Sequence, residues 1–180
     1  MFQKILVAID KFAVEEGVLQ AAISLAQLTQ AKLLLLHVLT PSNEGYPSPM
    51  FLRPDNIYPQ LYEAAWKSYA LQMETFNQQE MEWLRSLAEQ TKAVGIEVET
   101  SRVQGDPGQT LCEVARSWGA DLIMVGRRGY SGLNELLVGS VSNYVLHHAP
   151  CAVLALQHQT PQPLHQSEAL SAGDSPSTGL

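Results

Sequence analysis

The stretch KLLLLHV, Lys32–Val38, decides the class of fold. A strand with one exposed face alternates apolar and polar residues, whereas a strand covered on both faces of a parallel sheet is nearly continuous in apolar residues. This stretch is of the second kind. It therefore predicts a strand of a parallel sheet with helices on both faces.

The residues before this strand supply a second strand and a helix. Phe2–Ile9 (FQKILVAI) is a short run rich in β-branched and aliphatic residues, and Asp10 ends it. It is too short for a buried helix, so we predict a strand. Between the two strands, apolar residues recur every three or four positions, as on one face of a helix, and we predict one helix over Val14–Gln30.

The rest of the folded chain repeats this alternation. The patterns predict helices from about Tyr62 to Ala93, over Gln109–Trp118 and over Val141–His148, and strands over Ile96–Val103, Asp121–Val125 and Cys151–Leu156. Asp106 and Pro107 of the turn GDPG suit the cap and first turn of the second of these helices. We therefore expect an α/β fold: a single doubly wound domain with a five-stranded parallel sheet of order 3-2-1-4-5 and helices on both faces.

The boundaries of this domain follow from composition. A chain of 180 residues fits one domain, which we place at residues 1–156. Prolines crowd residues 41–60, a predicted long loop insert that could act as a lid or a partner surface. Residues 157–180 have little to bury and are expected to form a disordered tail. The aromatic stripe of the long helix is interpreted as core or partner contact.

Charge and cysteine content limit the classes of partner. The net charge of −7 repels polyanions, so neither nucleic acid nor an anionic membrane is expected as a partner. The start of the chain lacks the features of a signal peptide, and no apolar stretch approaches the roughly 20 residues that cross a bilayer. We therefore expect a cytoplasmic protein. Cys112 and Cys151 are too few and too far apart for a metal knuckle, and we interpret them as buried free thiols.

A glycine-rich loop carries the chemistry. Gly126, Gly129 and Gly139 have the spacing G-x2-G-x9-G, follow a predicted strand and precede a helix. Such a loop can turn several N–H groups toward a phosphate, and the helix that begins near Ser140 adds its own free N–H groups and positive dipole end. The Ser140 and Ser142 hydroxyl groups could add bonds. Arg127 and Arg128 are either phosphate ligands or solvated surface charges.

Asp10 lies where the same ligand would be expected. In doubly wound sheets, ligands bind beyond the carboxyl ends of the strands where the strand order reverses, and Asp10 and Gly126 end the two strands at that point. The Asp10 carboxylate could bond a ribose hydroxyl group, help hold Mg²⁺ on phosphate oxygens, or only cap the first helix. The motifs of P-loop NTPases, serine hydrolases and dinucleotide oxidoreductases are absent.

The pattern G126-x2-G129-x9-G139-S140 after DLIMV resembles the ATP-binding motif of the universal stress protein family. The segments KILVAID, LLLLHV and GDPG fit the same family, and the resemblance covers about residues 2–156. It implies a homodimer that binds ATP or AMP, possible Mg²⁺ or Mn²⁺, and a role in stress responses rather than robust catalysis. By motif position, Ala8, Ile9 and Val38 would line the adenine and ribose pocket, Asp10 would meet the ribose or metal, and Gly126, Arg128, Gly129, Gly139, Ser140 and Val141 would surround the phosphates.

One segment departs from the family pattern. Lys11-Phe12-Ala13 stand where family members often have small or hydroxyl residues. Lys11 could add a phosphate contact, or Phe12 could narrow the pocket, so the number of bound phosphates stays open.

The sequence thus leads to one main hypothesis with two alternatives. The main one is an adenine-nucleotide-binding stress-response regulator that acts through a nucleotide-gated interaction with an unknown regulatory partner and dimerises through Cys151–Leu156, an exposed edge strand. The first alternative is a slow ATP hydrolase or phosphotransferase, for which no catalytic residue is assigned. The second is a nucleotide-free dimerisation module.

Overall fold

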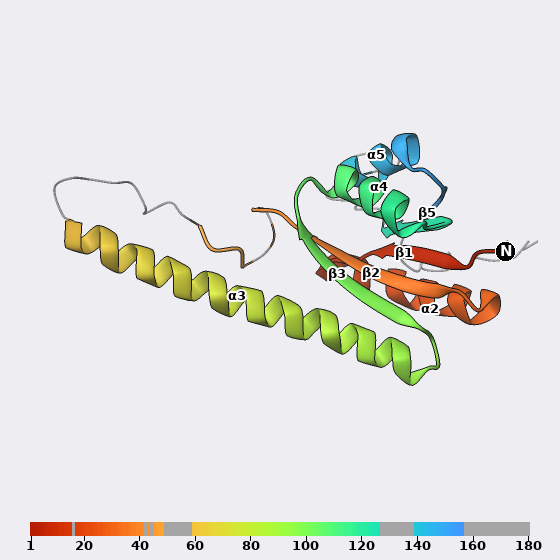
Figure 1. Cartoon of the computed structure of the whole chain (residues 1–180), viewed down its shortest axis with the longest axis horizontal. Helices are drawn as coiled ribbons and strands as arrows, with labels where there is room; N and C mark the ends of the chain where they lie inside the picture. The colour runs from red at the N-terminus through yellow and green to blue at the C-terminus, as the bar shows by residue number, and fades with distance from the viewer. Residues whose placement is uncertain (16, 42, 44, 49–58, 127–138, 157–180) are drawn as a thin grey trace, which may run out of the picture.

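A parallel sheet of five strands in the order β3-β2-β1-β4-β5 forms the centre of the protein (Figure 1). The computed structural model describes residues 1–15, 17–41, 43, 45–48, 59–126 and 139–156. The strands are β1 (Lys4–Ala8), β2 (Lys32–Leu39), β3 (Val98–Gln104), β4 (Leu122–Gly126) and β5 (Ala152–Leu156). The predicted fold class and strand order are therefore confirmed.

Alternate residues of the inner strands face two separate cores. Ile5 and Leu33 point to the face covered by α2 (Val18–Thr29) and α3 (Pro59–Ala93). Leu6 and Leu34 point to the other face, which is covered by α4 (Pro107–Trp118) and α5 (Ser140–His148). Because both faces are covered, β2 has few polar residues, which explains the nearly continuous apolar run.

The first predicted helix is wrong in one respect. The chain forms a short helix α1 (Lys11–Glu15) and then α2, instead of one helix over Val14–Gln30. Gly17 separates them with a φ of 77°, a left-handed conformation that a glycine adopts without steric cost. Helical periodicity continues across this break, which is why the sequence pattern did not reveal it.

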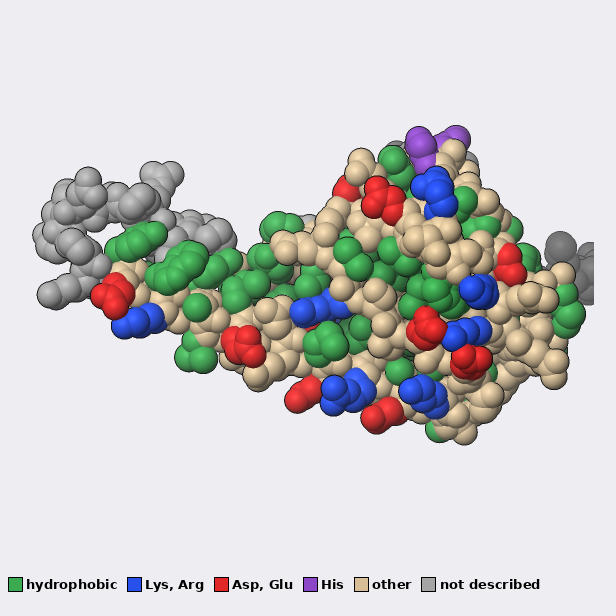
Figure 2. Space-filling model, viewed as in Figure 1, with side chains coloured by type: hydrophobic (Ala, Val, Ile, Leu, Met, Phe, Trp, Pro, Cys, Tyr) green, Lys and Arg blue, Asp and Glu red, His purple; other side chains and the backbone are tan. Residues whose placement is uncertain are grey.

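Helix α3 is 35 residues long and extends well beyond the sheet (Figure 1). Its C-terminal half is buried through residues such as Phe76, Leu84 and Leu87. Its N-terminal half leaves Trp66 and Leu71 52% and 68% exposed, and apolar side chains lie along this part of the helix in Figure 2. The apolar stripe of α3 is therefore part of the core in the C-terminal half of the helix and is exposed in the N-terminal half.

Two predictions about domain boundaries fall partly or wholly outside the described residues. The predicted loop at 41–60 is described only at 41, 43, 45–48 and 59–60, and α3 already begins at Pro59. The predicted tail, residues 157–180, is not described. None of the described helices is long and apolar enough to span a membrane.

Candidate functional site

A cavity of about 630 Å³ opens at the carboxyl ends of the inner strands, and this volume lies within the range of small-molecule sites. Most of the predicted site residues meet there: Ala8, Ile9, Asp10, Val38, Gly126, Gly139, Ser140, Val141 and Ser142. Arg128 and Gly129 lie outside the described residues. Their predicted phosphate contacts stay a prediction.

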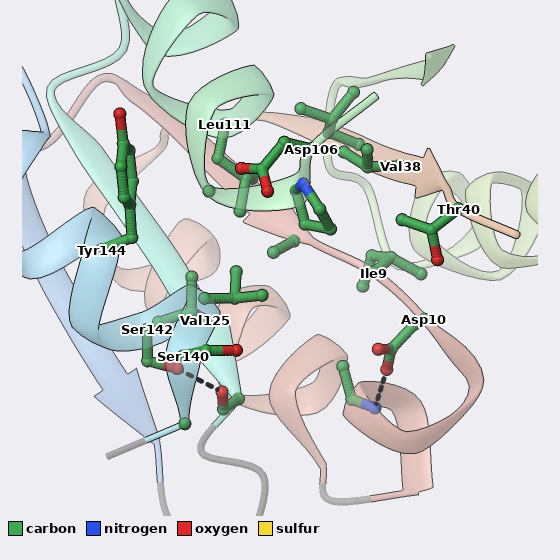
Figure 3. Close-up of a pocket in the computed structure, with 18 of the residues that line it drawn as sticks. Ile9, Asp10, Val38, Thr40, Asp106, Leu111, Val125, Ser140, Ser142 and Tyr144 are labelled. Carbon is green, nitrogen blue, oxygen red and sulfur yellow. Dashed lines mark hydrogen bonds between the residues drawn. The ribbon is translucent and has the colours of Figure 1, made fainter. Parts of the chain in front are cut away.

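The topology of the sheet creates this cavity. β1 lies between β2 and β4, so the chain leaves neighbouring strands toward opposite faces of the sheet. The loops that follow the strands diverge there and leave a crevice at the reversal of strand order. In Figure 3, Asp10 and Ser140 lie on opposite sides of one end of the cavity, and Val38 and Asp106 lie toward the other end.

Asp10 caps the first helix. Its Oδ1 atom accepts a hydrogen bond of 2.7 Å from the Ala13 backbone N–H (Figure 3). The sequence offered a cap for a helix over Val14–Gln30, whereas the helix that Asp10 caps is α1 (Lys11–Glu15). A carboxylate can accept several hydrogen bonds, so a second role toward a ligand remains compatible with the cap.

The cavity also receives the N-terminus of α5. Gly139 is the N-cap residue, and no side chain among the described residues makes a capping hydrogen bond there. The first N–H groups of a helix have no partner within the helix, and together with the dipole they favour an anion. Gly139 has a φ of −55°, so left-handed freedom is not the reason for glycine here. The absence of a side chain leaves the helix end accessible.

Ser142 has a structural bond that the sequence did not suggest. Its hydroxyl group is buried and donates a hydrogen bond of 2.9 Å to the Gly126 carbonyl oxygen (Figure 3). A hydroxyl group has a single proton to donate. Ser142 therefore fastens the start of α5 to the end of β4, and its proton is already committed to that bond.

Sequence reasoning missed several lining residues: Thr40, Asn43, Asp106, Gly108, Leu111 and Tyr144. The turn GDPG was interpreted as a helix start and as part of the family pattern, and Asp106 does cap α4 by accepting a 3.0 Å bond from the Gln109 N–H. Gly108 has a packing role at this wall. A Cβ atom there would lie 2.8 Å from Cδ1 of Tyr144, so glycine lets α4 and α5 approach closely at the cavity wall.

The described wall of the cavity combines apolar side chains with two carboxylates. Ile9, Val38 and Leu111 supply apolar surface, whereas Asp10 and Asp106 supply the charged groups. This part of the wall suits a planar base and hydroxyl groups, whereas the N-terminus of α5 suits an anion. Among the described residues, no group of three or more His, Cys, Asp and Glu side chains could hold a metal ion.

The fold and site define a doubly wound α/β domain with a ligand-sized cavity at the reversal of strand order. The family model described as the universal stress protein family matches residues 1–157, and the chain belongs to this family. The chain is 37% identical to the universal stress protein Sll1388 of Synechocystis, over 87% of this chain and 99% of that protein. It is 31% identical to the universal stress protein YxiE of Bacillus subtilis, over 87% of this chain and all of that protein (100%).

Solved structures share the fold at lower identity. The structure of the protein MJ0577 matches with a TM-score of 0.64 and 21% identity, over 88% of this chain and 98% of that one. A universal stress protein in complex with cAMP matches with a TM-score of 0.56 and 24% identity, over 88% and 98%. An Arabidopsis thaliana universal stress protein family member with AMP bound matches with a TM-score of 0.52 and 18% identity, over 88% and 93%.

Proposed function

We propose that this protein binds an adenine nucleotide, AMP or ATP, in the cavity and uses it to regulate a partner. The observation that carries the proposal is that an apolar wall with a carboxylate and a helix N-terminus line the same cavity. Ile9, Asp10 and Val38 form one part of the wall, and the N-terminus of α5 at Gly139–Ser140 forms the other. An apolar wall with a carboxylate suits a nucleoside, and a helix N-terminus suits a phosphate.

Family members support the choice of adenine. One structural neighbour was solved with cAMP and another with AMP. In this chain we assign Ala8, Ile9 and Val38 to the base and ribose, and Asp10 to a ribose hydroxyl group. We assign Gly126, Gly139, Ser140 and Val141, with Arg128 and Gly129, to the phosphates.

A metal ion in this cavity would need the phosphate oxygen atoms of the nucleotide as ligands. Mg²⁺ is usually held by one or two carboxylates together with phosphate oxygens. In this cavity we assign the carboxylate role to Asp10. We propose Mg²⁺ or Mn²⁺ only for a polyphosphate ligand. Titration of AMP and ATP with and without Mg²⁺ tests this, because the ion should strengthen ATP binding and leave AMP binding unchanged.

The regulatory output is proposed to be a protein interaction in the cytoplasm. Family membership connects the chain to stress responses, and the exposed apolar side chains on the N-terminal half of α3 offer a surface for an unidentified partner. The competing function is slow hydrolysis or transfer of the bound phosphate. Incubating pure protein with ATP for hours separates the two, because a binding module returns its ligand unchanged.

We also propose a homodimer through β5. This strand lies at the edge of the sheet, none of its residues is fully buried, and Leu154 is 38% exposed. An uncovered apolar edge favours pairing with another strand. Leu154→Lys should shift the protein toward monomer in light scattering, and Leu28→Lys, on an exposed residue of α2, serves as the control. A wild-type protein that is monomeric at micromolar concentration contradicts the proposal.

The experiment that tests the proposed ligand is mass spectrometry of small molecules released from purified protein. We expect AMP, ATP or a related adenine nucleotide in stoichiometric amount. A protein that releases no nucleotide and then fails to bind added AMP and ATP would support the nucleotide-free alternative.

A further inference from the structure

Glu80 is a buried carboxylate on the face of α3 that packs against the sheet. Its side chain is only 7% exposed, and its two oxygen atoms approach two different cationic or ionisable groups. Oε2 lies 3.0 Å from Nε2 of His37 in β2, and Oε1 lies 3.7 Å from Nζ of Lys11 in α1. A carboxylate is costly to bury without partners, so these contacts determine whether Glu80 can stay inside.

The His37 ring connects Glu80 to the cavity wall. Its other nitrogen, Nδ1, lies 2.7 Å from the carbonyl oxygen of Ile9, which lines the cavity. A carbonyl oxygen can only accept a hydrogen bond, so Nδ1 carries a proton. His37 is 2% exposed, and its ring also packs edge-on against Trp83 at 5.3 Å between centroids, which restricts its orientation.

Nε2 of His37 is buried, and the Glu80 carboxylate is the polar group that lies against it. With Nδ1 protonated, a neutral ring has a bare Nε2, and a bare nitrogen facing a carboxylate at 3.0 Å would be repulsive. The contact is attractive when a proton lies between Nε2 and the carboxyl oxygen, on either atom. The pair then has no net charge, which suits its burial.

The Ile9 carbonyl group belongs to the peptide unit that places Asp10. The Ile9 N–H donates to Leu36 of β2 at 2.9 Å, so β2 holds both polar groups of Ile9, one through its backbone and one through the His37 ring. Beyond this peptide the chain leaves the sheet and turns into α1. Lys11 on the far side of Asp10 also approaches Glu80. Glu80 therefore approaches Lys11 directly, and on the other side of Asp10 it reaches Ile9 only through the His37 ring.

We propose that Glu80 is a positioning residue for the cavity: through His37 it fixes the Ile9–Asp10 peptide and thereby the Asp10 carboxylate. The inference rests on the proposed nucleotide site for its effect on affinity. It also gives α3 a direct connection to the site, because any displacement of α3 against β2 moves Glu80 away from His37. The connection runs from the Glu80 carboxylate, which lies 3.0 Å from Nε2 of His37, through the ring to the contact of Nδ1 with the Ile9 carbonyl group.

Two substitutions of Glu80 separate hydrogen bonding from packing. In Glu80→Gln, the amide N–H can donate to the bare Nε2 of neutral His37, so the chain to Ile9 is kept. In Glu80→Leu, Nε2 loses its partner. We expect AMP affinity within about twofold of wild type for Glu80→Gln and a loss of about tenfold for Glu80→Leu, a change of about 1.4 kcal/mol. Leu84→Val, one turn further along the buried face, lowers the melting temperature but should leave affinity unchanged.

A readout that needs no nucleotide keeps this inference separate from the proposed function. The Ala13 N–H is bonded to Asp10, so its hydrogen exchange reports the position of that carboxylate. Exchange at Ala13 should be faster in Glu80→Leu and unchanged in Glu80→Gln and Leu84→Val. A wild-type protein that binds no nucleotide would overturn the proposed function, while the exchange measurement would still test the role of Glu80.

A double variant covers the case in which Glu80→Leu does not fold. His37→Phe with Glu80→Leu replaces both buried polar partners by apolar groups, which is often neutral for stability, yet it removes the bond to the Ile9 carbonyl group. Fast Ala13 exchange in this folded variant would support the proposal. Ala13 protection equal to wild type, or equal loss of affinity in Glu80→Gln and Glu80→Leu, would overturn it.

Discussion

Ser142 of α5 donates its hydroxyl proton to the carbonyl oxygen of Gly126 at the end of β4, at 2.9 Å. These residues flank the segment 127–138, so the bond fixes both ends of the glycine-rich region relative to each other. The N-terminus of α5 is held at the cavity by this contact.

Replacing Ser142 by Ala should lower the free energy of unfolding by about 1 kcal/mol, because the Gly126 carbonyl group loses its buried partner. Ser140 is exposed at the first position of the same helix and serves as the matched control. Ser140→Ala should leave stability unchanged and weaken nucleotide binding. Urea denaturation and calorimetric titration measure the two effects, and equal stability losses in both variants would contradict the assignment.

Replacing Gly139 by Val should abolish nucleotide binding and change stability little. The φ of −55° is accessible to valine, so the expected effect comes from side-chain atoms placed at the helix N-terminus in the cavity. A thermal-shift titration with AMP measures the loss. Binding equal to wild type would mean that the anion does not lie at this helix end.

Replacing Gly108 by Ala should destabilise the protein by about 1–3 kcal/mol, because the new Cβ atom overlaps the Tyr144 side chain. Tyr144→Ala removes the ring carbons Cδ1 and Cγ but keeps Cβ, which lies 2.9 Å from the new atom, so it relieves part of the overlap and the two changes should be non-additive in a double-mutant cycle. Denaturant unfolding of the single and double variants measures the coupling. Additive losses would show that the two helices can separate without cost.

Stability should fall at alkaline pH through the buried thiol of Cys112. Burial raises the pKa of Cys112, so the unfolded thiol loses its proton at a lower pH than the folded one. The contribution of this thiol to the free energy of unfolding is complete below the ordinary thiol pKa of about 8.5. It decreases as pH rises toward the pKa of the folded state, by at most about 1.4 kcal/mol per pH unit. Comparing unfolding at pH 7 and pH 10 for wild type and Cys112→Ala isolates this slope. Parallel pH profiles would contradict it.

The sequence predicted the inner strands because burial on both faces makes them nearly continuous in apolar residues, as in Lys32–Val38. It also predicted the cavity residues that follow strand ends, since topology brings those ends together. It missed Tyr144 and Asp106, whose place in the wall depends on how closely α4 and α5 pack. The break at Gly17 and the His37–Glu80 contact were also missed, because both depend on three-dimensional contacts that no periodicity records.

Calorimetric titration of AMP and ATP into wild-type protein first freed of ligand tests the central claim most directly. We predict saturable binding of one nucleotide per chain, with a melting temperature that rises by several degrees at about 100 times the dissociation constant, where the added stability is about 2.7 kcal/mol. Absence of heat and of any thermal shift with both nucleotides, on folded and ligand-free protein, would contradict the account.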